Sequence, residues 1–273
     1  MNFLICPICG HSFMKNNHSL VCENGHCFDI ARQGYVNLLR PGGAGRRHGD
    51  DRRMVASRTA FLNAGFYHPL RSAVADLVLH HAKSGDVLLD AGCGEGFYTS
   101  YIRGALTDAG LSASVYGIDV SRDAILACAA RDRAIVLAVA SISAIPMAKE
   151  SVDILINLFA PFDAREFSRV MKPGGILIRA FPGKRHLFEL KEAVYKVPYE
   201  NEITTLELDG FTLVAKRELR FPLHLDENEQ IQALFQMTPY YYKTSREDQE
   251  KLLHLRSLAV TAEFLLVEYQ KTI

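Results

Sequence analysis

The feature that most constrains the fold is a glycine-rich turn between an apolar strand and a helix. An apolar run over residues 86–91 ends in Asp90-Ala91-Gly92-Cys93-Gly94-Glu95-Gly96, and helical periodicity follows from Phe97. Glycine lets the backbone turn tightly and approach a ligand without interference from Cβ. The helix that follows offers unpaired N–H groups at its N-terminus. This order predicts a ligand-binding βα unit in an α/β protein.

Strand-like and helix-like segments alternate along most of the chain, which predicts βαβ units and a mostly parallel sheet with helices on both faces. The last two strand segments are long, and we expect them to pair antiparallel at one edge. The seven expected strands cover residues 86–91, 114–119, 134–139, 152–158, 175–181, 211–221 and 258–269. Helices are expected over 54–83 (with a break near Tyr67), 97–107, 122–131 and 164–171.

The glycine motif differs from the dinucleotide-binding fingerprint G-x-G-x-x-G. Its third glycine comes one residue early, and Asp90 precedes the first. An acidic residue there suits a cationic ligand better than a pyrophosphate. The next strand ends at Asp119, where a carboxylate can accept hydrogen bonds from ribose hydroxyls. The alternative interpretation is a purely structural glycine turn.

Composition indicates an ordinary globular protein. The 273 residues are 48% apolar and 23% charged, which allows a full core and excludes a disordered tail or a disulfide-stapled miniprotein. No apolar run approaches the roughly 20 residues that span a bilayer. The N-terminus lacks the features of a secretory signal, so we expect a cytoplasmic location and no membrane partner. Because the formal net charge is zero, binding to a polyanion would require a local basic patch.

Four of the six cysteines lie within the first 27 residues. In a reducing compartment such a cluster favours metal ligation over disulfides. The pairs Cys6-x2-Cys9 and Cys22-x3-His26 suit one tetrahedral structural zinc ion, which would supply the folding energy of so short a segment. Cys27 competes with His26 as the fourth ligand.

The sequence predicts three regions: a zinc-binding module over 1–39, a flexible basic linker over 40–58 and an α/β domain over 59–273. Arginines concentrate in and near the linker. They are Arg32, Arg40, Arg46, Arg47, Arg52, Arg53 and Arg58. Such a stretch can bind RNA phosphates in a salt-dependent way; a solvated linker is the alternative. Tyr240, Tyr241 and Tyr242 could stack on bases, or pack in the core.

Residues 86–181 resemble the S-adenosylmethionine-dependent methyltransferases of the Rossmann-like class I, whose first motif is V-L-D-x-G-C-G-x-G. The resemblance implies S-adenosylmethionine as cofactor. It implies contacts to the methionine half from Gly92, Gly94 and Glu95, to the ribose from Asp119, and near the adenine from Ser141. Asp90 belongs to the same set of expected cofactor-binding residues.

The whole chain closely resembles the bacterial 23S rRNA guanine-N1 methyltransferases. The segments that carry this resemblance are the Cys/His module and residues 28–39, 61–70, 159–161, 183–187 and 237–239. It implies zinc at Cys6, Cys9, Cys22 and His26, favouring His26 over Cys27, and it implies a 23S rRNA hairpin as substrate. It also implies cofactor contacts from Tyr67 and His186. Without it, Tyr67 would be assigned to the core and His186 to a surface helix start.

Methylation at guanine N1 requires removal of a proton from that nitrogen, and the base must leave its stack to reach the site. The segment after the strand over 152–158 is expected to face the methyl donor. Asn157 could therefore bind the base, and Asp163 could act as general base; a strand terminator and a helix N-cap are the alternatives. Competing functions are a small-molecule methyltransferase and a non-catalytic cofactor-binding protein. A homodimer presenting two zinc modules to one RNA is also compatible with the sequence.

Overall fold

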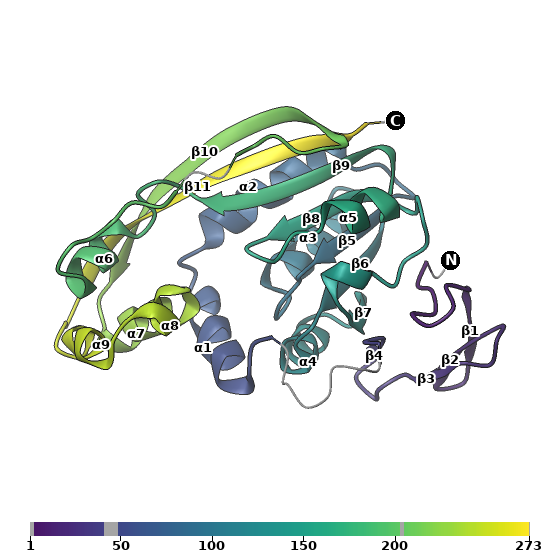
Figure 1. Cartoon of the computed structure of the whole chain (residues 1–273), viewed down its shortest axis with the longest axis horizontal. Coiled ribbons are helices and arrows are strands. Elements are labelled where there is room, and N and C mark those ends of the chain that lie inside the picture. The colour runs from purple at the N-terminus through teal and green to yellow at the C-terminus, as the bar shows by residue number, and fades with distance from the viewer. Residues whose placement is uncertain (1–2, 41–48, 203–204, 273) are drawn as a thin grey trace.

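The computed structural model describes residues 3–40, 49–202 and 205–272. A mixed sheet runs through the molecule (Figure 1), and its strands are ordered β10-β11-β9-β8-β5-β6-β7-β4. Its strands are β4 (Val36–Asn37), β5 (Val87–Ala91), β6 (Ser114–Asp119), β7 (Val136–Val139), β8 (Val152–Leu158), β9 (Met171–Pro182), β10 (Phe211–Leu225) and β11 (Leu258–Lys271). Strands β4 to β9 pair in parallel, while β10 and β11 pair antiparallel at one edge. The expected Rossmann-like architecture is confirmed.

Both faces of the sheet are buried at its central strands, which explains why β5 and β8 are apolar at most positions. All five residues of β5 are buried. One face packs against α1 (Arg52–Asn63), α2 (His68–His81), α3 (Phe97–Asp108) and α4 (Arg122–Arg131). The opposite face packs against the 3₁₀ turn η1 (Ile142–Ala144), α5 (Ala164–Val170) and the N-terminal module.

The sheet has eight described strands rather than the seven expected, because residues from the N-terminal module join it. Val36 pairs with Ala138 and Asn37 with Val139, extending the sheet beyond β7. A two-residue strand is defined by its long-range partner and leaves no local pattern in the sequence. The expected end of the N-terminal module at residue 39 therefore assigns β4 to the module, although β4 is an edge strand of the large sheet.

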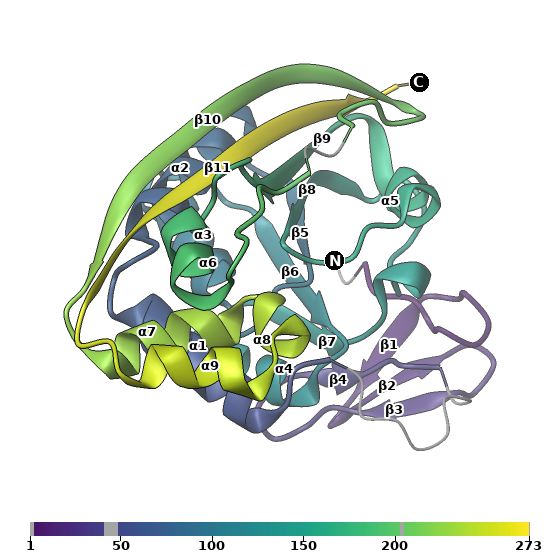
Figure 2. The ribbon, with the colours of Figure 1, turned by 60° about the vertical axis from the view of Figure 1, so that its left-hand side comes forward.

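The N-terminal module is a three-stranded antiparallel sheet of β1 (Phe13–Asn16), β2 (Ser19–Cys22) and β3 (Cys27–Asp29). It lies beside β4 and β7 (Figure 2). A hydrogen bond of 2.9 Å from Ile5 N to Pro146 O and a bridge between Leu4 and Met147 attach it to the larger domain. Buried side chains of the module share a core cluster with the larger domain, so the two are packed together.

The expected basic linker is shorter than residues 40–58. Residues 41–48 lie outside the described part of the chain, and α1 already begins at Arg52. The Asp51 carboxylate caps this helix by accepting hydrogen bonds from Arg53 N (2.8 Å) and Met54 N (3.0 Å). Arginine is a good helix former, so a charged run that resembles a linker also fits the first turns of a capped helix.

The helices between β9 and β11 gather at one end of the molecule, whereas β10 runs along β11 (Figure 1). These helices are α6 (Phe188–Val194), α7 (Asn228–Met237), α8 (Tyr240–Lys243) and α9 (Arg246–Leu253). No helix in the described residues has the length and apolar character needed to cross a membrane.

Candidate active site and zinc centre

A cavity of about 820 Å³ opens where the parallel strands β5, β6, β8 and β9 reach their carboxyl ends. Ligands bind at this edge in open α/β sheets because the loops that follow the strands converge there. Nine of the ten residues expected for cofactor binding and catalysis line it. They are Tyr67, Asp90, Gly92, Gly94, Glu95, Asp119, Ser141, Asn157 and His186.

The turn after β5 requires glycine for two reasons. Gly92, Gly94 and Gly96 all have positive φ (+95°, +54° and +81°), a conformation that residues with a side chain rarely adopt. A Cβ on Gly92 would also lie 2.3 Å from Ala160 Cβ, and one on Gly96 would lie 2.5 Å from Cys128 Sγ. The turn is therefore wedged between the loop after β8 and helix α4, and it exposes backbone to the cavity.

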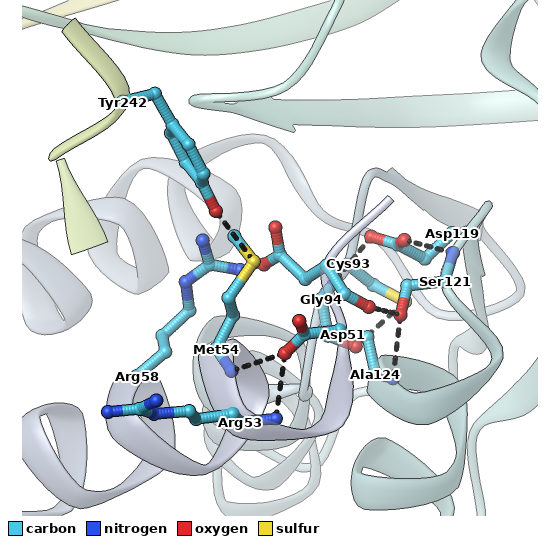
Figure 3. A network of polar contacts seen from close by, with 11 residues as sticks. Asp51, Arg53, Met54, Arg58, Cys93, Gly94, Asp119, Ser121, Ala124 and Tyr242 are labelled. Carbon is cyan, nitrogen blue, oxygen red and sulfur yellow. Dashed lines mark hydrogen bonds and ion pairs between the residues drawn. The ribbon is translucent and has the colours of Figure 1, made fainter. Parts of the chain in front are cut away.

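Asp119 ends β6 with both carboxylate oxygens held by backbone (Figure 3). Oδ2 accepts from Gly94 N at 3.0 Å, and Oδ1 accepts from Ser121 N at 2.8 Å. Burial raises the pKa of this carboxyl above its usual value. Each oxygen keeps lone pairs for a further hydrogen bond, so the pair of ribose hydroxyls expected from the sequence can be accommodated.

Two other acidic groups line the same part of the cavity. Glu95 is buried and forms an ion pair with Arg131, with 3.0 Å between Oε2 and Nε; its Oε1 is buried without a partner in the described residues. Asp90 Oδ2 accepts from Thr99 Oγ1 at 2.6 Å. Burial raises the pKa of Asp90 to about 7. A bound cation would restore its ionised form.

Asp90 gives the unliganded protein a specific pH dependence. Its pKa rises from 3.8 to about 7 on folding, so the folded state holds a proton that the unfolded state loses in this range. The contribution of Asp90 to the free energy of unfolding therefore falls as pH rises from about 4 to about 7. Asp90→Asn is expected to flatten this decline, measured by urea unfolding across that range. An identical slope in wild type and variant would contradict the assignment.

His186 and Tyr67 occupy the end of the cavity near β11. The His186 ring packs on Phe264 with 4.5 Å between centroids, and its Nδ1 accepts from Glu263 N at 3.1 Å. Burial lowers the pKa of His186 to about 4, so the ring is neutral and its proton is on Nε2. Tyr67 contacts Phe264 edge-on. His186 can thus donate a hydrogen bond into the cavity from Nε2, but it is not a base near neutral pH.

The two candidate catalytic residues are separated by the structure. Asn157 lies at the end of β8 and lines the cavity. Asp163 is not among the lining residues; its Oδ1 accepts from Arg165 N and Glu166 N at 3.1 Å each and caps α5. The general-base hypothesis for Asp163 is therefore replaced by the N-cap alternative.

The Cys/His cluster forms at two tight turns of the N-terminal module. Gly10 N donates to Cys6 O (2.8 Å) and Gly25 N donates to Cys22 O (2.9 Å), and both glycines have positive φ. These turns place the side chains of each pair together. The ligand atoms of Cys6, Cys9, Cys22 and His26 all lie within 4.8 Å of one another.

Three of the separations between these atoms are close to those that zinc requires. Tetrahedral Zn–S and Zn–N bonds require ligand separations of roughly 3.5–3.8 Å. The structure has 3.6 Å between Cys9 Sγ and Cys22 Sγ, 3.6 Å from Cys6 Sγ to His26 Nδ1, and 3.3 Å from Cys22 Sγ to the same nitrogen. Cys27 is exposed and outside the cluster, so His26 is the fourth ligand. Four protein ligands describe a structural site.

Comparisons with known proteins match both parts. Residues 4–41 match the zinc-ribbon family described as "RlmA, N-terminal", and residues 89–179 match a methyltransferase domain. A Bacillus subtilis (strain 168) protein, YxjB, named as a candidate 23S rRNA (guanine-N1)-methyltransferase, is 32% identical, covering 94% of this chain and 93% of YxjB. The chain belongs to the 23S rRNA (guanine-N1)-methyltransferase family.

A second relative agrees with this membership, and one solved structure agrees with the fold. The 23S rRNA (guanine(748)-N(1))-methyltransferase of Streptomyces fradiae is 33% identical over 84% of this chain and 82% of that protein. A chain from the complex between the Haloferax volcanii Trm112 methyltransferase activator and a methyltransferase is 16% identical, with a TM-score of 0.51 over 82% of this chain and 100% of that chain. The latter supports the fold alone.

The cavity of this family member fits S-adenosylmethionine, the cofactor that its methyltransferase domain implies. The acidic groups suit the positively charged methyl donor and its ribose. The turn at Gly92, which has no room for a Cβ, brings the backbone close to the bound cofactor. Part of the cavity lining was not revealed by the sequence: Gly49, Asp50 and Arg58 line it, and Asp50 forms an ion pair with Arg58. Arg179 was missed as well. Its signal was a single charge inside the apolar strand over 176–181.

Proposed function

We propose that the protein transfers a methyl group from S-adenosylmethionine to N1 of one guanine in a 23S rRNA hairpin. The observation that carries this is the combination, in one packed chain, of a zinc ribbon and a methyltransferase cavity, matched by 32% identity over 94% of the chain. A ribosomal RNA substrate would place the enzyme in the cytoplasm. The N-terminal module through β4 would recognise RNA, and the chain from α1 onward would perform catalysis.

We assign the cofactor contacts from the geometry of the cavity. Asp119 would accept from the ribose hydroxyls, and Ser141 would lie near the adenine. The methionine half would lie along the glycine turn, with Asp90 and Glu95 nearby. Tyr67 and His186 would close the cavity on the β11 side, where the neutral His186 can donate from Nε2. S-adenosylmethionine supplies the electrophilic methyl group, and these residues supply its orientation.

RNA binding would use the exposed arginines of the module and of α1. Arg32, Arg40, Arg52 and Arg53 are exposed, whereas Arg46 and Arg47 lie outside the described residues. Arg58 is ion-paired at the cavity and is not assigned to RNA. Tyr242 is 64% exposed and can stack on a base, while Tyr240 is buried. Phosphate contacts of this kind predict an affinity that falls steeply with salt.

The first test is methylation of protein-free 23S rRNA and of ribosomal precursors, followed by nucleoside mass spectrometry and primer extension. We expect N1-methylguanosine at one hairpin position, at a rate that falls as salt rises. A substrate RNA already methylated at that position serves as the control. Absence of transfer to both RNAs would overturn the proposal and favour a small-molecule substrate. Sedimentation with and without RNA would test the proposed homodimer that offers two zinc modules to one hairpin.

A further inference from the structure

Arg179 is a partly buried cation at the cavity without an acidic partner in the described residues. It lies toward the carboxyl end of β9, and its guanidinium carbon is 4.0 Å from the ring centroid of Phe162 and 4.5 Å from that of Phe181. Its Nε is buried without a hydrogen-bond partner among the described groups. Desolvation lowers the pKa of this guanidinium, although arginine remains charged. Two aromatic rings thus hold a poorly hydrated donor at a binding site.

Asn157 lies beside Arg179 in the sheet. The two residues are direct partners across the parallel strands β8 and β9, and both line the cavity. Asn157 Nδ2 donates to Ala91 O and to Pro161 O, each at 3.0 Å. These bonds use both amide hydrogens, which leaves Oδ1 as an acceptor. A fixed donor therefore lies next to a fixed acceptor.

The geometry points to this pair as the reader of the target base: Arg179 donates to O6 of guanine, and Asn157 accepts from its 2-amino group. This inference rests on the proposed function. Guanine presents an acceptor at C6 and an amino donor at C2, whereas adenine presents an amino donor at C6. The same pair would therefore place donor against donor with adenine. Phe159, 47% exposed at the cavity, offers an aromatic face on which an extruded base can lie.

Arg179 would also act in the reaction itself. The N1–H bond breaks and its proton passes to solvent; the N1 electron pair forms a bond to the methyl carbon, and the carbon–sulfur bond breaks to leave a neutral thioether. Loss of the N1 proton places negative charge on O6. A preorganised cation at O6 stabilises that charge in the transition state.

We assign the proton to solvent because each acidic side chain that lines the described cavity already has a hydrogen-bond or ion-pair partner. Asp50 is paired with Arg58 and Glu95 with Arg131, while Asp90 and Asp119 are bonded to Thr99 and to backbone. His186 is neutral, with Nδ1 already accepting. Tyr269 of β11 is a titratable group whose charge would raise the pKa of Arg179. A cation at O6 would make guanine N1 a stronger acid and remove the need for a base.

The test compares Arg179→Met and Arg179→Lys with a matched control. Arg71 in α2 is also stacked, with its guanidinium carbon 4.6 Å from the Phe97 centroid and 4.1 Å from that of Tyr101; its Nε is likewise buried without a partner in the described structure. Arg71 does not line the cavity. Arg71→Met therefore measures what removing a stacked arginine does to folding alone.

Single-turnover methylation of the 23S hairpin should slow about 10²- to 10³-fold in Arg179→Met and about 10-fold in Arg179→Lys. The rising limb of the pH–rate profile should move to higher pH in Arg179→Met, because N1 loses its proton less readily. Arg71→Met should stay within about 3-fold of wild type, and the Kd for S-adenosylmethionine should be unchanged in all three. An unchanged rate and pH profile in Arg179→Met would overturn the inference.

An RNA with inosine at the target position tests the Asn157 contact, because inosine lacks the 2-amino group. The wild-type protein should methylate the inosine RNA about 10-fold more slowly than the guanosine RNA. Asn157→Ala should methylate both RNAs at equal rates, and thermal melting checks that this variant is folded. Full discrimination in Asn157→Ala would overturn the contact. A weaker Kd for RNA alone, or for S-adenosylmethionine alone, in Arg179→Met would instead assign Arg179 to a phosphate or a carboxylate. If the wild-type protein forms no N1-methylguanosine, the proposed function is wrong. If the wild type is active and Arg179→Met is equally active, the role of Arg179 alone is wrong.

Discussion

Replacing Cys9 with alanine is expected to release zinc and to abolish methylation of 23S rRNA while binding of S-adenosylmethionine persists. Cys9 is one of four ligands whose atoms fit a tetrahedral ion, and structural zinc contributes on the order of 10 kcal/mol to the folding of such modules. Without it, the turns at Gly10 and Gly25 lose the ion that joins them. Zinc content by elemental analysis and methylation of the rRNA measure the result.

Cys27→Ser is the matched control for this variant. Cys27 is adjacent to a ligand in sequence, but it is exposed and outside the cluster. Its zinc content and activity should equal those of wild type. Zinc retained by Cys9→Ala, or lost from Cys27→Ser, would show that the ligand set is wrong. Loss of S-adenosylmethionine binding in Cys9→Ala would show instead that the packed module is required to hold the catalytic sheet together.

Gly92→Ala is expected to lose binding of S-adenosylmethionine and to destabilise the protein by about 2–5 kcal/mol. The backbone at Gly92 has φ +95°, which costs alanine about 1–2 kcal/mol. The added Cβ would meet Ala160 Cβ at 2.3 Å, and overpacking of this kind costs about 1–3 kcal/mol. Ala160 precedes Pro161, whose carbonyl holds Asn157. The clash therefore disturbs both the cofactor and the base side of the cavity.

Gly104→Ala provides the comparison. Gly104 lies within α3, and a Cβ there would meet no heavy atom within 4 Å. Alanine in a helix interior is favoured over glycine by about 1 kcal/mol, so this variant should be slightly more stable and fully active. Urea unfolding and isothermal titration with S-adenosylmethionine measure both variants. Wild-type affinity in Gly92→Ala would mean that the turn moves freely and is not the cofactor cradle.

Several features could be predicted from sequence because they depend on local patterns. Strands β6 and β8 have the expected limits, since strands buried on both faces are continuous apolar runs. Helix α4 also has the expected limits, Arg122–Arg131. The zinc ligands are paired within tight turns, and the glycine turn directly follows its strand. The roles of Tyr67 and His186 in the cavity depended on resemblance alone and stay proposals.

Other features were decided by contacts between distant parts of the chain. Val36 and Asn37 become a strand because β7 presents a free edge, and Asp163 caps α5 outside the cavity. The acceptor on Asn157 is fixed by two backbone carbonyls, and the donor on Arg179 is fixed by Phe162 and Phe181. Periodicity and spacing report which residues are buried and which are near neighbours along the chain. They do not report the register of paired strands or the side-chain contacts between distant segments. Strand register is what places Arg179 beside Asn157.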